Sequence, residues 1–67
     1  MIAVSVNGIT EYYERPLAVS ELVERMALAG RKIAVERNGE IVPRGVHGVT
    51  LLANGDRLEI VVAVGGG

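Results

Sequence analysis

Residues 2–13 read IAVSVNGITEYY and predict a β-hairpin. Apolar side chains stand at every second position from Ile2 to Val6, which is typical of a strand with one buried face. Asn7-Gly8 follows directly and is the strongest short signal for a two-residue hairpin turn. Residues 9–13 are rich in β-branched and aromatic side chains, so we expect them to return as a second strand.

The period of the apolar residues changes after this hairpin. The new apolar positions have helical spacing and are Val19, Leu22, Val23 and Met26. They predict one helix of about three turns. Ser20 is a candidate N-cap, with Ala18 as the alternative start, and Gly30 is the expected stop.

The rest of the chain predicts strands joined by tight turns. Strands are expected at residues 33–37, 41–42 and 57–64, and turns at Asn38-Gly39 and Asn54-Gly55-Asp56. The order of elements is then β-β-α-β-β-β. Hairpins segregated from a single helix indicate an α+β fold, with the helix packed on one face of a mixed sheet of about five strands.

Composition limits the classes of function. The chain has 67 residues, of which 49% are hydrophobic and 22% charged, so we expect one globular domain over residues 1–64 and a flexible glycine tail at 65–67. The net charge of −1 gives no electrostatic case for binding nucleic acid or an anionic membrane. The N-terminus has no basic segment typical of a signal peptide, and we expect a cytoplasmic protein.

Residues suited to catalysis are scarce. The chain has no cysteine, so it can form no disulfide, and its one histidine, His47, cannot build a zinc site. The carboxylates fall mainly on predicted solvent-facing positions. We therefore expect no catalytic residue, no metal site and no cofactor bound by this chain, and not an enzyme but a protein on which partner enzymes act.

The C-terminal residues Gly65, Gly66 and Gly67 point to chemistry of another kind. Without side chains they form a thin arm, about 10 Å long when extended, that can thread a narrow channel in a partner. The carboxylate of Gly67 becomes an electrophile only when its oxygen is turned into a leaving group, as in an acyl-adenylate, and a sulfur nucleophile could then convert it to a thiocarboxylate. The ATP and metal for that reaction must come from the adenylating partner. The alternative is that the glycines are a linker remnant or a frayed end.

The last predicted strand also suggests a docking surface. Leu58 and Ile60 should face the helix and the core, while Glu59, Val61 and Ala63 should point outward. We expect the outward residues to contact the partners, although exposed apolar residues are common without any such role.

The ordered set of these segments resembles the ThiS family of sulfur carriers, which have the ubiquitin-like β-grasp fold. The resemblance rests on the strand ending in Asn7-Gly8 and on the helix at Val19–Leu28. It also rests on VERNGEIVPR at 35–44 and on NGDRLEIV at 54–61, which leads into VGGG at 64–67. Family members often carry a hydroxyl residue near Ala18, which this chain lacks.

The resemblance implies a role in making the thiazole ring of thiamine. A ThiF-type adenylyltransferase would adenylate the carboxylate of Gly67. A sulfur relay from a cysteine desulfurase or similar source would turn it into a thiocarboxylate. A ThiG-type thiazole synthase would then take the sulfur, with Gly65 and Gly66 as the stem that threads each partner site.

Three other readings remain open on the sequence. The small subunit of molybdopterin synthase shares the fold and the Gly-Gly end, and the large partner that accepts the sulfur distinguishes it. A ubiquitin-like modifier would form lysine-linked adducts, although Lys32 is the only internal acceptor for chains. A non-covalent binding module would keep its function without Gly66 and Gly67.

Overall fold

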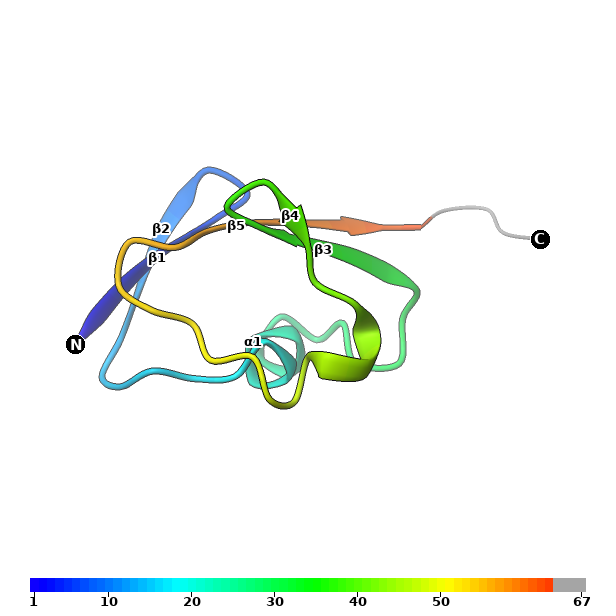
Figure 1. The fold of residues 1–67 in the computed structure, drawn as a ribbon, viewed down its shortest axis with the longest axis horizontal. Helices are drawn as coiled ribbons and strands as arrows, with labels where there is room; N and C mark the ends of the chain where they lie inside the picture. Colours follow the sequence, from blue (N-terminus) through cyan, green and yellow to red (C-terminus); the bar gives the residue numbers. More distant parts are fainter. Residues whose placement is uncertain (64–67) are drawn as a thin grey trace.

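The computed structural model describes residues 1–63, which form a sheet, one α-helix and one 3₁₀ turn (Figure 1). The elements of this part are β1 (Ile2–Val6), β2 (Ile9–Tyr13), α1 (Val19–Arg25), β3 (Ile33–Arg37), β4 (Glu40–Ile41), the 3₁₀ turn (Arg44–Val46) and β5 (Arg57–Val62). The predicted order of elements is confirmed.

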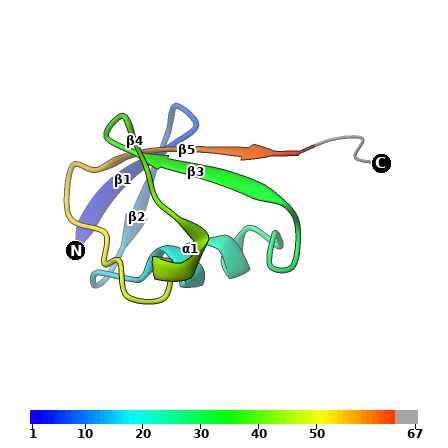
Figure 2. The same ribbon diagram turned by 45° about the vertical axis from the view of Figure 1, so that its right-hand side comes forward.

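The strands form one mixed sheet in the order β2-β1-β5-β3-β4. The last strand, β5, lies in the centre, parallel to β1 and antiparallel to β3. The two hairpins β1–β2 and β3–β4 flank it. Helix α1 lies across one face of the sheet, and the other face is uncovered by any element of residues 1–63 (Figure 2). This is the expected β-grasp architecture.

Both predicted Asn-Gly hairpin turns are confirmed. The φ angles are 50° and 86° at Asn7 and Gly8, and 52° and 87° at Asn38 and Gly39. Positive φ at both central residues defines a type I′ turn, whose twist suits the flanking strands. In Figures 1 and 2 both turns rise on the side of the sheet opposite α1.

The side chain of each asparagine also ties its turn to a strand distant in sequence. In all three Asn-Gly pairs, the side-chain oxygen accepts a hydrogen bond from a strand amide. The bonds run from Ile60 N to Asn7 Oδ1 (2.8 Å), from Arg57 N to Asn38 Oδ1 (2.9 Å) and from Ala3 N to Asn54 Oδ1 (2.7 Å). The two hairpin turns are thereby tied to β5, and the turn before β5 is tied to β1.

The core lies between the inner face of the sheet and α1. Its buried side chains come from both layers and from the connecting loops, and they are Ile2, Val4, Val6, Leu17, Val19, Leu22, Val23, Val35, Val42, Leu52, Leu58 and Ile60. Ile2, Val4 and Val6 share the buried face of β1, as their alternation predicts. The loop residues Leu17 and Leu52 close the core where no strand or helix covers it.

Helix α1 is shorter than predicted. It ends at Arg25 after seven residues, well before Gly30. Ala27 adopts a left-handed conformation with φ 60°, and its amide bonds to Glu24 O while the next amide, of Leu28, bonds to Val23 O. These two bonds form a Schellman motif, which satisfies the last carbonyls and turns Leu28 onto the core.

Ala18 is the N-cap of α1, as the alternative start predicted, and it makes no side-chain capping hydrogen bond. The first-turn amides of Val19 and Ser20 instead donate to the carbonyls of Thr50 (2.9 Å) and His47 (3.1 Å). Because helix N-termini leave amides without intrahelical partners, this loop replaces the hydroxyl cap that Ala18 cannot supply. The expectation that Ser20 caps the helix was wrong, since Ser20 lies inside it.

Candidate functional site

Strand β5 carries the predicted docking residues, and its two faces are those that the sequence predicts. Leu58 and Ile60 are 1% and 6% exposed and lie in the core. Glu59 and Ala63 are exposed, and Val61 is 62% exposed, on the face away from α1. The three outward residues are therefore accessible together along one side of β5.

The register of β5 is held as far as Ala63. It pairs with β3 from Leu58 to Val62, and Ala63 N donates to Lys32 O at 2.8 Å. Its pairing with β1 covers only Arg57 and Leu58, because β1 turns away at Asn7. β5 thus leaves the sheet at the end of the molecule opposite the N-terminus (Figure 1).

The predicted reactive terminus begins beyond this point. Gly65, Gly66 and Gly67, and the boundary at Val64 between domain and tail, lie outside the described residues. The structure therefore defines the base from which the terminus extends, namely Ala63 and its bond to Lys32.

Two residues beside the predicted docking residues were missed from the sequence. The register places Ala34 opposite Val61 and Glu36 opposite Glu59, on the same outer face. Ala34 is exposed and Glu36 is half-buried. The alternation in residues 33–37 indicates which of them share a face, but it does not indicate that β3 pairs with β5.

Asn7 does more than form a turn. Its carboxamide accepts from Ile60 N at 2.8 Å and donates to Ile60 O at 3.2 Å, where the next residue of β1 would otherwise pair with β5. The side chain thereby satisfies both backbone groups of Ile60, directly before Val61. It holds the middle of β5 in place beside the docking residues.

Asp56 is a buried carboxylate that sequence reasoning assigned to the surface with the others. It is 7% exposed and accepts hydrogen bonds from Arg37 Nε (2.9 Å), Asn38 Nδ2 (3.1 Å) and the amide of Ala53 (2.8 Å). Burial by itself would raise the pKa of this carboxyl, but the hydrogen bonds and the guanidinium of Arg37 outweigh it. The pKa of Asp56 therefore lies below its ordinary value of 3.8.

His47 follows the 3₁₀ turn in the loop between β4 and β5, and it is buried. Its Nε2 donates to Val42 O at 3.0 Å, and its own carbonyl accepts from the first turn of α1. These contacts fix the loop between β4 and β5 against the helix. They give His47 a structural role and leave it without a nucleophile to activate.

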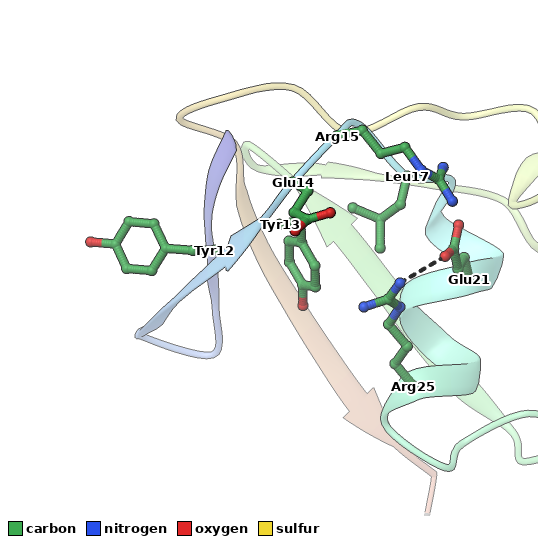
Figure 3. A pocket seen from close by; sticks show the side chains of 7 residues that line it. All are labelled: Tyr12, Tyr13, Glu14, Arg15, Leu17, Glu21 and Arg25. Atoms are coloured by element: carbon green, nitrogen blue, oxygen red, sulfur yellow. Dashed lines mark hydrogen bonds and ion pairs between the residues drawn. The ribbon is translucent and has the colours of Figure 1, made fainter. Parts of the chain in front are cut away.

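A hollow of about 270 Å³ lies between the end of β2 and α1 (Figure 3). The ring of Tyr13 points into it and lies 5.5 Å from the guanidinium of Arg25, which also pairs with Glu21 at 3.0 Å. Burial and the charge of Glu11 raise the pKa of Tyr13, against the opposing charge of Arg25. Arg25 and Glu21 pair with each other along the wall, and the residues that line the hollow present no nucleophile with a base.

The ring of Tyr12 points to the opposite side of β2 from that of Tyr13 and is exposed (Figure 3). Of the two neighbouring tyrosines, Tyr13 thus packs against the core and Tyr12 lies on the surface. In the described part of the chain, no three potential metal-ligating side chains cluster. No helix between residues 1 and 63 is long and apolar enough to cross a membrane.

Comparison with known proteins gives a consistent result. A model of the ThiS family matches residues 2–67. A thiamine biosynthesis protein (ThiS) from Geobacter metallireducens has a similar crystal structure. Its TM-score is 0.82 at 30% identity, and the alignment covers 98% of this chain and all of that one. A solution structure of a thiamine biosynthesis protein from the same organism gives a TM-score of 0.78.

Two of the similar sequences belong to much longer proteins. A thiazole synthase from Paramagnetospirillum magneticum is 39% identical over 62 residues, and one from Magnetococcus marinus is 34% identical over 64 residues. The chain spans about a fifth of the length of each, 19% and 20%, while 92% and 96% of the chain itself is matched. An uncharacterized protein of Pyropia yezoensis, ycf40, is 29% identical and is matched over 93% of its length.

Proposed function

Because this chain belongs to the ThiS family, we propose that it is a sulfur carrier for the formation of the thiazole ring of thiamine. In this proposal Gly67 carries the sulfur as a thiocarboxylate, and Gly65 and Gly66 are the stem that enters the partner's reaction centre. The observation that carries the proposal is the family match, which runs through the whole β-grasp domain and includes the three glycines.

The proposed chemistry has two steps at the terminal carbonyl. First, a carboxylate oxygen of Gly67 attacks the α-phosphorus of ATP, and pyrophosphate leaves. The acyl carbon then carries AMP, a good leaving group, in place of an oxide, a poor one. Second, a sulfur nucleophile attacks the acyl carbon, and AMP leaves with the carbon–oxygen bond electrons. Hydrosulfide gives the thiocarboxylate directly, whereas a donor persulfide gives an acyl disulfide, whose sulfur–sulfur bond a thiol of the donor system then reduces to release the thiocarboxylate. A ThiF-type adenylyltransferase supplies the ATP site and the metal, and a cysteine desulfurase or similar source supplies the sulfur.

The carrier's own contribution is positional. Pairing with β3 and the carboxamide of Asn7 hold β5 up to Ala63. A rigid base lowers the conformational freedom that a partner must remove when it takes up the end of the chain. The chain then acts as a co-substrate, and its partners perform the catalysis.

A ThiG-type thiazole synthase is the proposed sulfur acceptor. Two proteins named thiazole synthase contain a segment similar to this chain within a longer polypeptide. A carrier segment joined to its acceptor would raise their effective concentration, so the fusion supports a functional pairing. The exposed residues Glu59, Val61 and Ala63 would form part of the surface that these partners contact.

Mass spectrometry of the intact protein tests the proposal. The chain is incubated with ATP, a ThiF-type adenylyltransferase and a sulfur source, and the terminal residue is then sequenced by fragmentation. Replacement of one oxygen by sulfur at Gly67 is the expected result. An unchanged mass, under conditions that convert the Geobacter ThiS protein, would contradict it.

The variant Gly66→Val is the matched control for the tail. A β-branched side chain would widen the stem, so conversion should be lost while the thermal unfolding of the domain stays the same. Full conversion of Gly66→Val would show that the terminus does not thread a narrow channel.

A further inference from the structure

The uncovered face of the sheet contains a pair of like charges. Glu36 of β3 and Glu59 of β5 are direct partners in the antiparallel register, so their side chains stand next to each other on the outer face. Like charges directly opposite one another destabilise a sheet, and residues at such positions are more favourably of opposite sign. The domain therefore keeps an arrangement that does not serve its own stability.

Neither carboxylate is neutralised within the described residues. The ion pairs between residues 1 and 63 join Arg25 to Glu21 and Arg37 to Asp56. Arg57 is on the same face as Glu59, but its side chain is within ion-pair distance of neither glutamate. The negative charge is thus available to a cation from outside the domain.

A hollow of about 350 Å³ gives such a cation room beside this pair. The two glutamates line it together with Arg57 and with Gly8 and Gly39, which belong to the two raised Asn-Gly turns. A Cβ atom built on either glycine would meet nothing within 4 Å. The space beside both glycines is therefore open toward the hollow.

The next outward-facing pair toward the C-terminus is apolar. Ala34 and Val61 stand opposite each other, both exposed, and the following outward residue is Ala63 at the base of the tail. The hollow with the two glutamates, an apolar pair and Ala63, the last described residue, thus follow one another along β3 and β5.

We propose that the adenylating enzyme docks on this face by inserting one arginine or lysine side chain between Glu36 and Glu59, while an apolar residue covers Ala34 and Val61. This inference rests on the proposed function, because it assumes that such an enzyme binds the chain. The planar guanidinium of arginine fits the site best, since it can donate to two carboxylates at once. Cross-strand partners have Cβ atoms about 5 Å apart, a spacing that one guanidinium can bridge.

The test is a binding measurement that does not require catalysis. The affinity of the full chain for the adenylyltransferase is measured by calorimetry without ATP, at low and at high salt. The double variant Glu36→Gln/Glu59→Gln should bind about tenfold more weakly at low salt, which is within the range measured for close interfacial charge pairs. Its affinity should also depend less on salt, because fewer charges are paired in the complex.

Two controls keep the result specific. Glu24→Gln removes an exposed carboxylate of α1, on the other side of the molecule, and should leave the affinity unchanged. The double variant should unfold at the same temperature as the unmodified chain or higher, because it removes a repulsive pair. A loss of affinity together with unchanged or raised stability excludes misfolding as its cause.

The inference is overturned if the double variant binds the adenylyltransferase as tightly as the unmodified chain. It is also overturned if only binding to the thiazole synthase weakens. The proposed function is tested separately by conversion of the unmodified chain to the thiocarboxylate. Conversion with unchanged affinity of the double variant would leave sulfur transfer standing and remove only this docking mode.

Discussion

Arg37 Nε donates a hydrogen bond of 2.9 Å to the buried carboxylate of Asp56 and thereby joins the end of β3 to the turn before β5. Asp56 is almost fully buried and Arg37 is about a third exposed. An unpaired charge at Asp56 would be costly, since burial disfavours its ionised form. The pair thus makes the start of β5 dependent on the protonation state of one carboxyl group.

This dependence predicts acid lability. The pKa of Asp56 in the folded state lies below 3.8, so folding is favoured by the ionised form. Its contribution to the free energy of unfolding is complete above the unfolded pKa and is lost as the pH falls through the folded pKa. Urea unfolding at pH values from about 6 down to 2 should show stability declining at the acid end.

The variant Asp56→Asn isolates this contribution. It should lower the free energy of unfolding near neutral pH by about 2 kcal/mol, the scale of hydrogen bonds to a charged group. The acid decline should be shallower in the variant than in the unmodified chain. Equal declines in both would show that other carboxyl groups are responsible.

The end of α1 predicts a stabilising substitution. Ala27 has φ 60°, a left-handed conformation that costs a residue with a Cβ atom about 1 kcal/mol relative to glycine. Ala27→Gly should therefore raise the free energy of unfolding by about that amount, measured as a higher urea midpoint with an unchanged slope. Ala29→Gly is the matched control, because Ala29 is also exposed and lacks a positive φ. Ala29→Gly should leave the free energy of unfolding unchanged or lower it. If Ala29→Gly raised stability and Ala27→Gly did not, the left-handed conformation of Ala27 would not be the cause.

Ala27 also explains why the end of α1 was predicted wrongly from the sequence. Local patterns predicted the strands, both hairpin turns and the position of α1, because alternation and Asn-Gly pairs act over a few residues. Alanine gives no signal for a left-handed residue, and so the helix was extended toward Gly30. The actual end is set by Leu28, which the Schellman motif turns onto the core.

Some residues of the candidate site were likewise predicted from the sequence, and others were missed. Its faces followed from alternation within one strand, so Glu59, Val61 and Ala63 were placed correctly. Ala34 and Glu36 were missed because they reach the site through pairing of β3 with β5, which no local pattern specifies. The burial of Asp56 was missed for the same reason.

Asn7 offers a test of the link between the first and last strands. Asn7→Gly keeps the positive φ that the turn requires but removes both hydrogen bonds to Ile60. The free energy of unfolding should fall by about 1–2 kcal/mol, at roughly 1 kcal/mol for each bond. Chemical denaturation measures this change.

Asn7→Asp separates the two bonds. Its carboxylate can still accept from Ile60 N, but it cannot donate to Ile60 O, and it sets a negative charge beside that carbonyl. This variant should also be less stable than the unmodified chain. If both variants unfold with the midpoint of the unmodified chain, the side chain of Asn7 does not stabilise β5.

Val61 offers the most direct test of the docking surface. It is 62% exposed, so Val61→Asp removes little buried apolar area, and the cost to the domain should be within about 1 kcal/mol, the span of strand propensities. In a complex the same position would be covered, and a buried aspartate without a partner is strongly unfavourable. Binding to the adenylyltransferase and to the thiazole synthase should therefore both weaken, by at least about tenfold in calorimetric titrations.

Val49→Asp provides the matched comparison, because Val49 is 80% exposed and lies in the loop before β5, away from the outer face of the sheet. The same substitution there changes net charge and surface polarity equally but should leave both affinities unchanged. A loss of affinity with Val61→Asp but not with Val49→Asp would place the partners on the outer face of the sheet. Equal affinities of the two variants for both enzymes would mean that the partners hold the chain by its terminus alone, and that Val61 is an ordinary exposed valine.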